Sequence, residues 1–192
     1  MILGLTGGMG GGKSTAARFF ENAGFKRIDS DQVVKERLLP RADVVERIAA
    51  RFPEVISEDG TVNRAALASR IFENEADLAW LEDWLHPLVY EVWRGELASD
   101  PNGRWVIEVP LLFEKRLENW FDFIVCVSTS SPNQLARLKE RGIPHSLAGK
   151  RISKQLPLAQ KIDLADFVLS NDGTPEALQA QVGHLAARLT KA

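Results

Sequence analysis

The stretch Gly7-Gly8-Met9-Gly10-Gly11-Gly12-Lys13-Ser14 decides the fold of this chain. It matches the pattern G-x-x-x-x-G-K-[ST], a loop whose backbone N–H groups surround the phosphates of a nucleotide. The apolar residues 2–6 before it are typical of a short buried strand, and residues 14–20 after it begin a helical stretch. A strand, this loop and a helix in that order predict a nucleoside triphosphate as the ligand.

Each residue type in the loop serves anion binding in its own way. Glycine occupies five of the eight positions, which lets the backbone turn tightly and present N–H groups that a Cβ atom would obstruct. Lys13 adds a positive charge, the Ser14 hydroxyl is a ligand for Mg²⁺, and the N-terminus of the following helix faces the same phosphates. A flexible glycine turn is the alternative, but it explains neither the preceding strand nor the Lys-Ser pair.

Composition narrows the class of protein. The chain has 192 residues, 45% of them hydrophobic and 26% charged, and a formal charge of −2, which argues against general binding to nucleic acid or anionic membranes. It shows neither a leader segment nor an apolar run approaching about 18 residues. The single Cys126 lies in an apolar run and excludes an internal disulfide. We expect a cytoplasmic enzyme, a monomer or small homo-oligomer, with no nucleic-acid or membrane partner.

Strand-like and helical segments alternate along the chain. This alternation is typical of an α/β sandwich, in which helices cover both faces of a parallel sheet. Between the second and third strands, residues 33–98 keep a helical periodicity without a convincing strand, which predicts a helical insertion. The expected strands are residues 2–6, 26–29, 105–109, 123–127 and 166–169.

Two aspartates follow the second expected strand, at the edge of the sheet where ligands collect in open parallel sheets. Asp29 and Asp31 are two residues apart, so an extended backbone would project both carboxylates to the same side, toward the phosphate loop. Such a pair could hold a metal and accept the proton of an attacking hydroxyl in phosphoryl transfer. The alternative is that Asp29, Ser30 or Asp31 caps the following helix, and one residue could do both.

Glu108 is a charged residue where a buried strand should continue apolar. P-loop enzymes often place an acid near Mg²⁺ at this point, so we expect a metal role, through water. The alternative is an acid exposed to solvent at the edge of the sheet. Val109 follows, and then Pro110 and Leu111; the proline ends the strand, and the leucine begins an apolar wall beside the acid.

Residues 137–161 are strongly basic, with seven basic residues against the single acid Glu140. Arg137 and Arg141 are spaced i, i+4, so this region could present cationic helix faces. Arginines that close over a triphosphate would stabilise the charge that spreads during transfer and exclude water; a solvated helix face is the alternative. The basic residues are Arg137, Lys139, Arg141, Lys150, Arg151, Lys154 and Lys161.

The helical insertion carries a histidine and several tryptophans. His86 precedes Pro87 in a helical pattern, where a structural or capping role is typical, and we retain it as a candidate substrate contact. Trp80, Trp84 and Trp93 recur at nearly helical spacing, which indicates packing, although such rings could also receive an adenine or pantetheine-like ligand.

Taken in order, these motifs resemble those of the dephospho-coenzyme A kinase family, and the likeness runs from Leu3 to about Gly173. The phosphate loop alone is shared by many families, whereas His-Pro followed by Pro-Leu-Leu-Phe-Glu is much more specific. The segments that carry the likeness are Leu5 through Thr15, Ile28-Asp29-Ser30-Asp31, Leu67 through Phe72, Leu85-His86-Pro87-Leu88, Val109-Pro110-Leu111-Leu112-Phe113-Glu114, Gln134-Leu135-Ala136-Arg137, Arg151-Ile152-Ser153-Lys154-Gln155, and Ala165-Asp166-Phe167-Val168 with Asn171.

The resemblance implies the fold of the P-loop nucleoside kinases, a three-layer α/β/α sandwich around a parallel five-stranded sheet. It implies two additions to this core: a helical substrate-binding insertion, residues 33–98, and a basic lid region, residues 137–161. The activity it implies is transfer of the γ-phosphate of ATP, with Mg²⁺, to the 3′-hydroxyl of the ribose of dephospho-CoA. The product would be CoA, formed in the last step of its biosynthesis.

The resemblance also implies roles for individual residues. Asp31 is the first choice for activating the 3′-hydroxyl, with Asp29 close by, and the two could exchange these roles. The expected catalytic residues are Asp31, Asp29, Lys13 and Arg137; the ATP-binding residues are Thr6, Gly8, Gly10, Gly11, Gly12, Lys13, Ser14 and Thr15; the substrate contacts are Asp31, His86, Pro110 and Leu111; and the metal-site residues are Ser14 and Glu108.

Three positions depart from the family pattern without removing a reacting group. Gly11 stands where serine or alanine is frequent, Ser30 where alanine is common, and Glu108 where aspartate or an apolar residue is frequent. Two rival functions remain: a kinase for another acceptor, such as a nucleoside, shikimate or gluconate, and a nucleotide-dependent switch or regulatory ATPase. The later motifs disfavour the first, and the absence of an Asn-Lys-x-Asp element, with the long insertion, disfavours the second.

Overall fold

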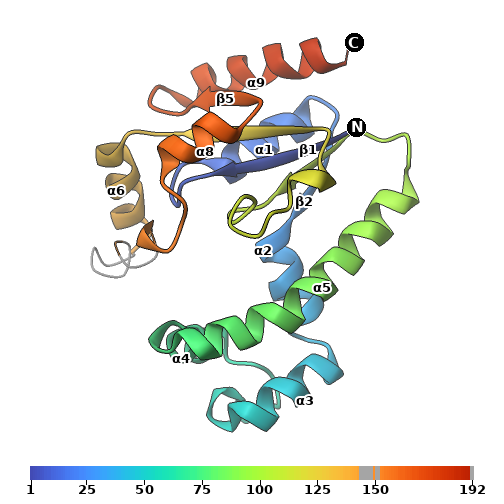
Figure 1. Ribbon diagram of the computed structural model, residues 1–192, viewed down its shortest axis with the longest axis vertical. Helices are drawn as coiled ribbons and strands as arrows, with labels where there is room; N and C mark the ends of the chain where they lie inside the picture. Colours follow the sequence, from blue (N-terminus) through green and yellow to red (C-terminus); the bar gives the residue numbers. More distant parts are fainter. Residues whose placement is uncertain (143–148, 150–151, 191–192) are drawn as a thin grey trace. The chain divides into compact units, whose positions relative to one another are not determined.

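A computed structural model describes residues 1–142, 149 and 152–190 of the chain (Figure 1). The chain divides into two compact units. The first, here called the sheet unit, comprises Met1–Asp29 and Asn102–Ala192, and the second, the helical unit, comprises Ser30–Pro101. No helix among the described residues is long and apolar enough to cross a membrane.

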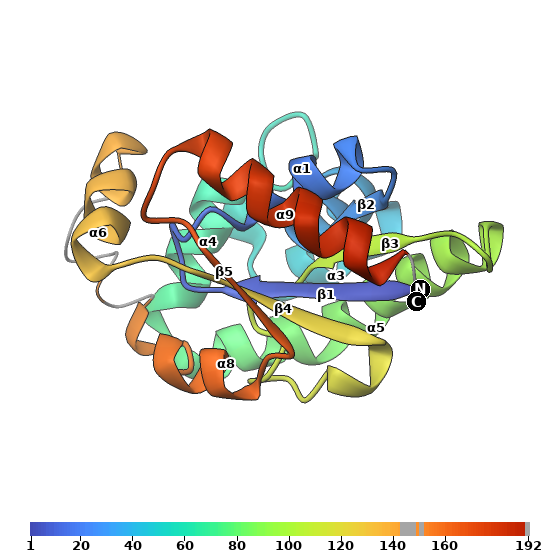
Figure 2. The ribbon, with the colours of Figure 1, turned by 90° about the horizontal axis from the view of Figure 1, so that it is seen from above.

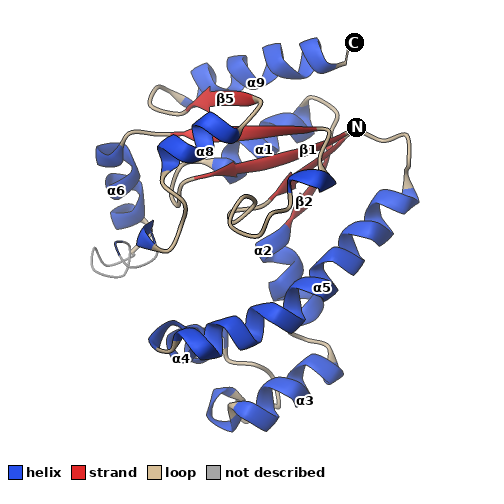
Figure 3. Cartoon of the chain, in the orientation of Figure 1, coloured by secondary structure: helices blue, strands red, loops and turns tan. Residues whose placement is uncertain are grey.

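The sheet unit contains five parallel strands in the order β2-β3-β1-β4-β5 (Figure 3). All five strands were predicted, each to within one residue at either end. The central position of β1 brings its carboxyl end to the middle of one sheet edge, between β3 and β4, where ligands bind in folds of this type. The strands are β1 Ile2–Gly7, β2 Lys26–Asp29, β3 Trp105–Glu108, β4 Phe123–Ser128 and β5 Phe167–Ser170.

Helices cover both faces of this sheet, as Figure 2 shows. On one face, α1 (Lys13–Asn22) and α9 (Pro175–Leu189) pack on a core that includes Leu3, Leu5 and Phe20. On the other face lie α8 (Leu158–Leu164) and the segment after β3, whose Leu112 meets the sheet at Gly4. The near-continuous apolar sequence of β1, β3 and β4 is what burial on both faces requires. The predicted α/β sandwich is confirmed.

Further described elements of the sheet unit flank β4. The helix α6, Ser131–Glu140, follows β4, and the short 3₁₀ turn η3, Glu118–Trp120, precedes it. Proline in the first turn of α6 suits the start of a helix, since that position needs no backbone N–H. Of the expected basic lid, residues 143–148 and 150–151, with Lys150 and Arg151, lie outside the described residues.

The helical unit, described in full, consists of helices and one isolated antiparallel bridge between Ile56 and Val62. Asn63 caps the helix Arg64–Glu73 and Asn74 caps the helix Glu75–Ser99, because each side chain accepts backbone N–H from the first turn. The elements are α2 Ser30–Gln32, the π-helical η1 Val33–Leu38, α3 Ala42–Arg51, the 3₁₀ turn η2 Pro53–Val55, α4 Arg64–Glu73 and α5 Glu75–Ser99.

A buried acid joins three helices of this unit. Asp77 of α5 receives Arg51 of α3 at 2.7 Å and Arg70 of α4 at 2.7 Å. The guanidinium of Arg51 also lies 4.8 Å from the ring centre of Trp80, and that of Arg70 lies 5.1 Å from the ring of Phe52. The packing role expected for the tryptophans agrees with these contacts, since aromatic rings and arginine planes stack here on each other.

Candidate active site

The phosphate loop joins β1 to α1 at the middle of the sheet edge. Within it, the Gly11 N–H donates to the Gly8 carbonyl at 3.0 Å, which closes a tight turn. Gly12 starts α1 with φ 96°, and a Cβ atom there would collide with the side-chain amide of Asn171. Only glycine combines this backbone conformation with so close a neighbour. The first turn of α1 therefore follows the loop directly.

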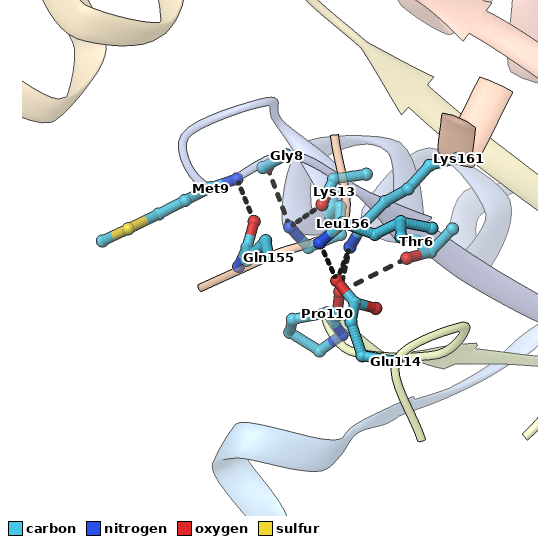
Figure 4. A network of polar contacts seen from close by, with 10 residues as sticks. Thr6, Gly8, Met9, Lys13, Pro110, Glu114, Gln155, Leu156 and Lys161 are labelled. Carbon is cyan, nitrogen blue, oxygen red and sulfur yellow. Dashed lines mark hydrogen bonds and ion pairs between the residues drawn. The ribbon is translucent and has the colours of Figure 1, made fainter. Parts of the chain in front are cut away.

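Lys13 and Thr6 have defined positions beside the loop (Figure 4). The Lys13 ammonium donates to the carbonyls of Gly7 and Gly8 at 3.1 and 3.0 Å. Thr6 is fully buried at the end of β1, and its hydroxyl lies 3.4 Å from the carbonyl oxygen of Pro110. An ammonium held beside a glycine-rich loop at the N-terminus of a helix suits the binding of phosphate oxygens.

Three charged residues meet at the carboxyl ends of β2 and β3. Glu108 pairs in register with Asp29, and Arg27 donates to both, at 2.7 Å to Glu108 and 3.1 Å to Asp29. The Glu108 side chain is only 5% exposed, because β3 lies between β2 and β1. The alternative of a solvent-exposed acid at the sheet edge is therefore wrong.

The structure also brings Glu108 together with Ser14, the two residues expected at a metal site. Burial raises the pKa of the Glu108 carboxyl, while a hydrogen bond with the Ser14 hydroxyl and the charge of Arg27 act in the opposite direction. The described residues contain no cluster of three or more His, Cys, Asp and Glu that could hold a metal. A hydroxyl and one carboxylate nevertheless fit Mg²⁺, which keeps several waters and takes further oxygens from phosphates.

The expectation for the aspartate pair needs correction. The extended backbone of β2 ends at Asp29, and Ser30–Gln32 already forms a helical turn. The prediction that both carboxylates project to the same side required an extended backbone through Asp31. That condition is not met, because the period of two applies only within a strand. Asp29 belongs to the sheet unit and Asp31 to the helical unit. His86 also belongs to the helical unit, where the centre of its ring lies 6.2 Å from that of Tyr90 on α5.

Arg137 lies on α6 and is linked to the phosphate loop through one residue. Its guanidinium donates to the Asn171 carbonyl at 2.7 Å and approaches the Thr129 hydroxyl at 3.4 Å. The Asn171 side chain in turn donates to the Gly11 carbonyl at 2.8 Å. Asn171 thus connects the expected catalytic arginine to the loop, a role that the sequence motif alone did not indicate.

Lys161 was counted among the basic residues of the lid region, and its environment requires a second correction. Its side chain is fully buried, and the ammonium donates to the Pro110 carbonyl and pairs with Glu114, both at 2.8 Å (Figure 4). Glu114 also accepts the N–H of Leu156 at 2.8 Å. A lysine so enclosed neutralises a neighbouring acid and holds the turn after β3, and it presents no cationic surface.

Four polar residues of the site were missed or left without a role by sequence reasoning. Asn171, Gln134 and Gln155 bind backbone groups of the loop, but neutral amides give no charge or periodicity signal. Asp172 accepts the Ser130 N–H at 2.7 Å and also accepts hydrogen bonds from the side chains of Asn133 and Thr129. Together these bonds hold the pKa of the Asp172 carboxyl well below its usual range. The one sequence signal for Asn171, Gln134 and Gln155 was that they stand within the segments that carry the family resemblance.

Comparison with known proteins gives concordant results. The family model described as dephospho-CoA kinase matches residues 1–176. A dephospho-CoA kinase of Syntrophotalea carbinolica is 38% identical over 194 residues, covering 98% of this chain and 92% of that protein. The dephospho-CoA kinase of Yersinia pseudotuberculosis is 36% identical over 194 residues, covering 99% of this chain and 93% of the relative.

Solved structures agree with the fold. The crystal structure of TT1252 from Thermus thermophilus has a TM-score of 0.84 and 30% identity, covering 98% of this chain and 97% of the other. A shikimate kinase from Bacteroides thetaiotaomicron, with a TM-score of 0.53 and 18% identity, covers 99% of this chain and 98% of its own, and supports the fold alone. Since the family model spans nearly the whole sequence and relatives above 30% identity match end to end, the chain belongs to the dephospho-CoA kinase family.

Proposed function

We propose that this chain transfers the γ-phosphate of ATP to the 3′-hydroxyl of the ribose of dephospho-CoA, giving CoA and ADP in the final step of CoA biosynthesis. The observation that carries this function is the family match over residues 1–176, which includes the phosphate loop with Lys13 and Ser14 at the head of α1. The chain is an ATP-dependent phosphotransferase whose acceptor is an alcohol.

ATP binds, in this proposal, at the carboxyl end of β1. Gly8, Gly10, Gly11, Gly12, Lys13, Ser14 and Thr15 bind the phosphates, mainly through backbone N–H groups of the loop other than that of Met9, and Thr6 lies beside the loop at the end of β1. Lys13 exchanges its bonds to the Gly7 and Gly8 carbonyls for bonds to phosphate oxygens. Such exchange favours the charged ligand, because a charge-assisted bond is stronger than one to a neutral carbonyl.

Mg²⁺ fits beside Ser14, with Glu108 acting through a bound water. When bound, the ion would neutralise part of the charge on the ATP phosphates. Burial of Glu108 opposes its ionised form, so a nearby cation is favourable there.

We expect Glu108→Gln to raise the Mg²⁺ concentration that gives half-maximal rate by about tenfold, because one negative charge near the ion is lost. An unchanged Mg²⁺ dependence would remove Glu108 from this role.

Asp31 is the proposed acceptor of the proton from the 3′-hydroxyl. A carboxylate beside the attacking oxygen serves this purpose in phosphoryl transfer, where most of the catalysis comes from positioning and charge. Asp29 is bound by Arg27 at 3.1 Å and pairs in register with Glu108, which favours a supporting role for it at the strand end. Exchange of these two roles is the alternative that the motif leaves open.

Arg137 stabilises the transferring phosphoryl group in this account. The acceptors of its described hydrogen bonds, the Asn171 carbonyl and the Thr129 hydroxyl, are both neutral, so its charge is available to an anion. Preorganised cations aimed at developing charge are among the strongest catalytic devices. The lid role of residues 137–161 as a whole is part of the same proposal and rests on family resemblance.

The acceptor binds, we propose, through the helical unit with His86, and through Pro110 and Leu111 in the turn after β3. Pro110 is fixed in this turn, since its carbonyl accepts from Lys161 at 2.8 Å. Leu111 is half-buried and offers an apolar side chain.

The test is a comparison of acceptors. Purified protein with ATP and Mg²⁺ should phosphorylate dephospho-CoA with a kcat/KM at least about 100-fold above that for adenosine, shikimate or gluconate, since a site built for polar groups rejects analogues that lack them. Equal turnover of all four acceptors, or none with dephospho-CoA, would contradict the assignment. ATP hydrolysis without any acceptor product would favour the regulatory ATPase instead.

We further propose that the enzyme works in the cytoplasm on small-molecule substrates, with no nucleic-acid or membrane partner, as a monomer or small homo-oligomer. The formal charge of −2 supports the absence of a nucleic-acid or membrane partner, because general binding to nucleic acid or anionic lipid needs a basic surface. Sedimentation velocity measured at several protein concentrations gives the oligomeric state directly.

A further inference from the structure

Met9 interrupts the glycines of the phosphate loop, and side chains hold both polar groups of its backbone. Gln134 of α6 donates its side-chain N–H to the Met9 carbonyl at 2.7 Å. The Met9 N–H donates to the side-chain oxygen of Gln155 at 3.2 Å, as Figure 4 shows. One glutamine comes from the helix after β4 and the other from the segment before α8, so two distant parts of the chain meet at one loop residue.

The loop and α6 fit closely at this point. A Cβ atom at Gly8 would lie 3.0 Å from the side-chain nitrogen of Gln134, so glycine there permits the approach. Gln134 itself is only 9% exposed. A hydrogen bond of a buried amide is costly to leave unmade, because water cannot replace the lost partner. The contact between Gln134 and the loop is therefore a fixed feature of the sheet unit.

We propose that Gln134 and Gln155 are positioning residues that hold the Met9 backbone and so keep the phosphate loop in its ATP-binding conformation. A loop with five glycines in eight residues has many accessible conformations, and rotation of the peptides on either side of Met9 would turn N–H groups away from the phosphates. Holding Met9 before ATP arrives reduces the ordering that binding requires. This inference rests on the proposed function of the loop as an ATP site.

The polarity of the two bonds gives a sharp test. The Met9 carbonyl only accepts and its N–H only donates, so position 134 must supply a donor and position 155 an acceptor. Glutamate keeps the acceptor but loses the amide donor. Gln155→Glu should therefore preserve the bond to Met9, whereas Gln134→Glu should abolish it, although both changes add the same charge beside the same residue. Methionine, of similar size, removes either bond.

The experiment compares Gln134→Met, Gln134→Glu, Gln155→Met and Gln155→Glu, with Gln160→Glu on the exposed surface of α8 as the control. Each methionine variant should raise the KM for ATP about fivefold to tenfold, the loss expected for one hydrogen bond. The kcat at saturating ATP and the KM for dephospho-CoA should stay within about twofold. Both glutamate variants add a negative charge beside the ATP phosphates, which raises the KM for ATP in each, so the informative quantity is the difference between them. Gln134→Glu should have a KM for ATP about fivefold to tenfold above that of Gln155→Glu, because only Gln155→Glu keeps its bond to Met9. Equal impairment in both glutamate variants would overturn the proposal.

A second measurement needs no turnover. Exchange of the Met9 amide hydrogen, followed by NMR without nucleotide, should be slow in wild type and in Gln155→Glu and at least about tenfold faster in Gln155→Met. Unchanged exchange in Gln155→Met would contradict the proposal even if activity fell. If the buried Gln134→Met variant fails to fold, the comparison of Gln155→Met with Gln155→Glu still tests the proposal. Failure of wild type to phosphorylate dephospho-CoA would reject the proposed function, while the amide exchange would still report on the glutamines.

Discussion

The sheet unit and the helical unit use their arginines and lysines differently. In the sheet unit, Lys13 and Arg137 donate to backbone carbonyls at the edge where β1 ends. In the helical unit, Arg51 and Arg70 pair with the buried carboxylate of Asp77, and their planes stack on aromatic rings. The described hydrogen bonds of Arg137 go to neutral acceptors, so its charge can act on an incoming anion, whereas a cation paired with an acid and covered by a ring contributes to packing.

Lys161 shows that this difference depends on the partner and not on the unit. It belongs to the sheet unit, yet it is fully buried and paired with Glu114, so its charge is neutralised inside the protein. Its ammonium also fixes the Pro110 carbonyl, next to the Thr6 hydroxyl. We therefore expect substitutions of Lys161 and Asp77 to change stability, and substitutions near the phosphate loop to change rates.

The largest effect is expected for Asp31→Asn. Loss of the proton acceptor should lower kcat about 10²-fold to 10⁴-fold, because general base catalysis contributes about that much. The KM for ATP should stay within a few-fold, as expected when the lost interaction acts mainly in the transition state. Steady-state kinetics with varied ATP and dephospho-CoA provide the measurement, with Asp29→Asn as the matched control. A larger loss in Asp29→Asn would exchange the two roles, and an equal loss of ATP affinity would make Asp31 a metal or structural residue.

Next in size is Lys161→Met, which leaves the Glu114 carboxylate without its buried cation. Breaking a buried pair from one side costs about 3 to 5 kcal/mol of unfolding free energy. Urea unfolding of the variant measures this, and the double variant Lys161→Met, Glu114→Leu should recover a large part of it. If Lys161→Met were as stable as wild type and only slower, Lys161 would be a catalytic cation and the distinction drawn from its burial would fail.

A smaller effect, about 2 kcal/mol, is expected for Asp77→Asn. The amide removes the charge that holds Arg51 and Arg70, but both arginines are partly exposed, at 40% and 38%, so water compensates in part. The KM for ATP should not change at temperatures where the variant is folded. Thermal unfolding and ATP kinetics test the two statements separately. A tenfold rise in the KM for ATP with unchanged stability would show that this cluster serves the nucleotide.

Sequence reasoning recovered the sheet more completely than the site, for physical reasons. Buried parallel strands must be apolar along their length, so the runs at β1 and β4 were visible, and the loop glycines are required by backbone geometry. Lys161 was misplaced because a buried lysine and a surface lysine have the same sequence signature. The helix start at residues 29–31 was only an alternative in the sequence analysis, because Asp-Ser-Asp is compatible with either a strand end or a helix start. Gln134 and Gln155 act on a distant loop backbone, and only the folded chain brings them together.

The smallest effect concerns Cys126 and pH. Burial raises the pKa of its thiol to about 11 from 9.0, so between these values the unfolded chain loses a proton that the folded chain keeps, and stability falls as pH rises. The loss is at most about 1.4 kcal/mol per pH unit over this window. Urea unfolding at pH 8 and pH 10.5 should show a smaller drop for Cys126→Ala than for wild type, since lysines and tyrosines titrate in both. Identical drops would show that the thiol is not protected by burial.

The most direct test of the central claim is to map the phosphorylated position by NMR. Wild-type protein, ATP, Mg²⁺ and dephospho-CoA are incubated together, and the product is analysed through the coupling between its new phosphorus and the ribose protons. We predict a single new phosphomonoester coupled to the proton on the 3′-carbon, with one ADP formed for each product molecule. A phosphate on the 2′-oxygen, or ADP formed without a phosphorylated acceptor, would contradict the account.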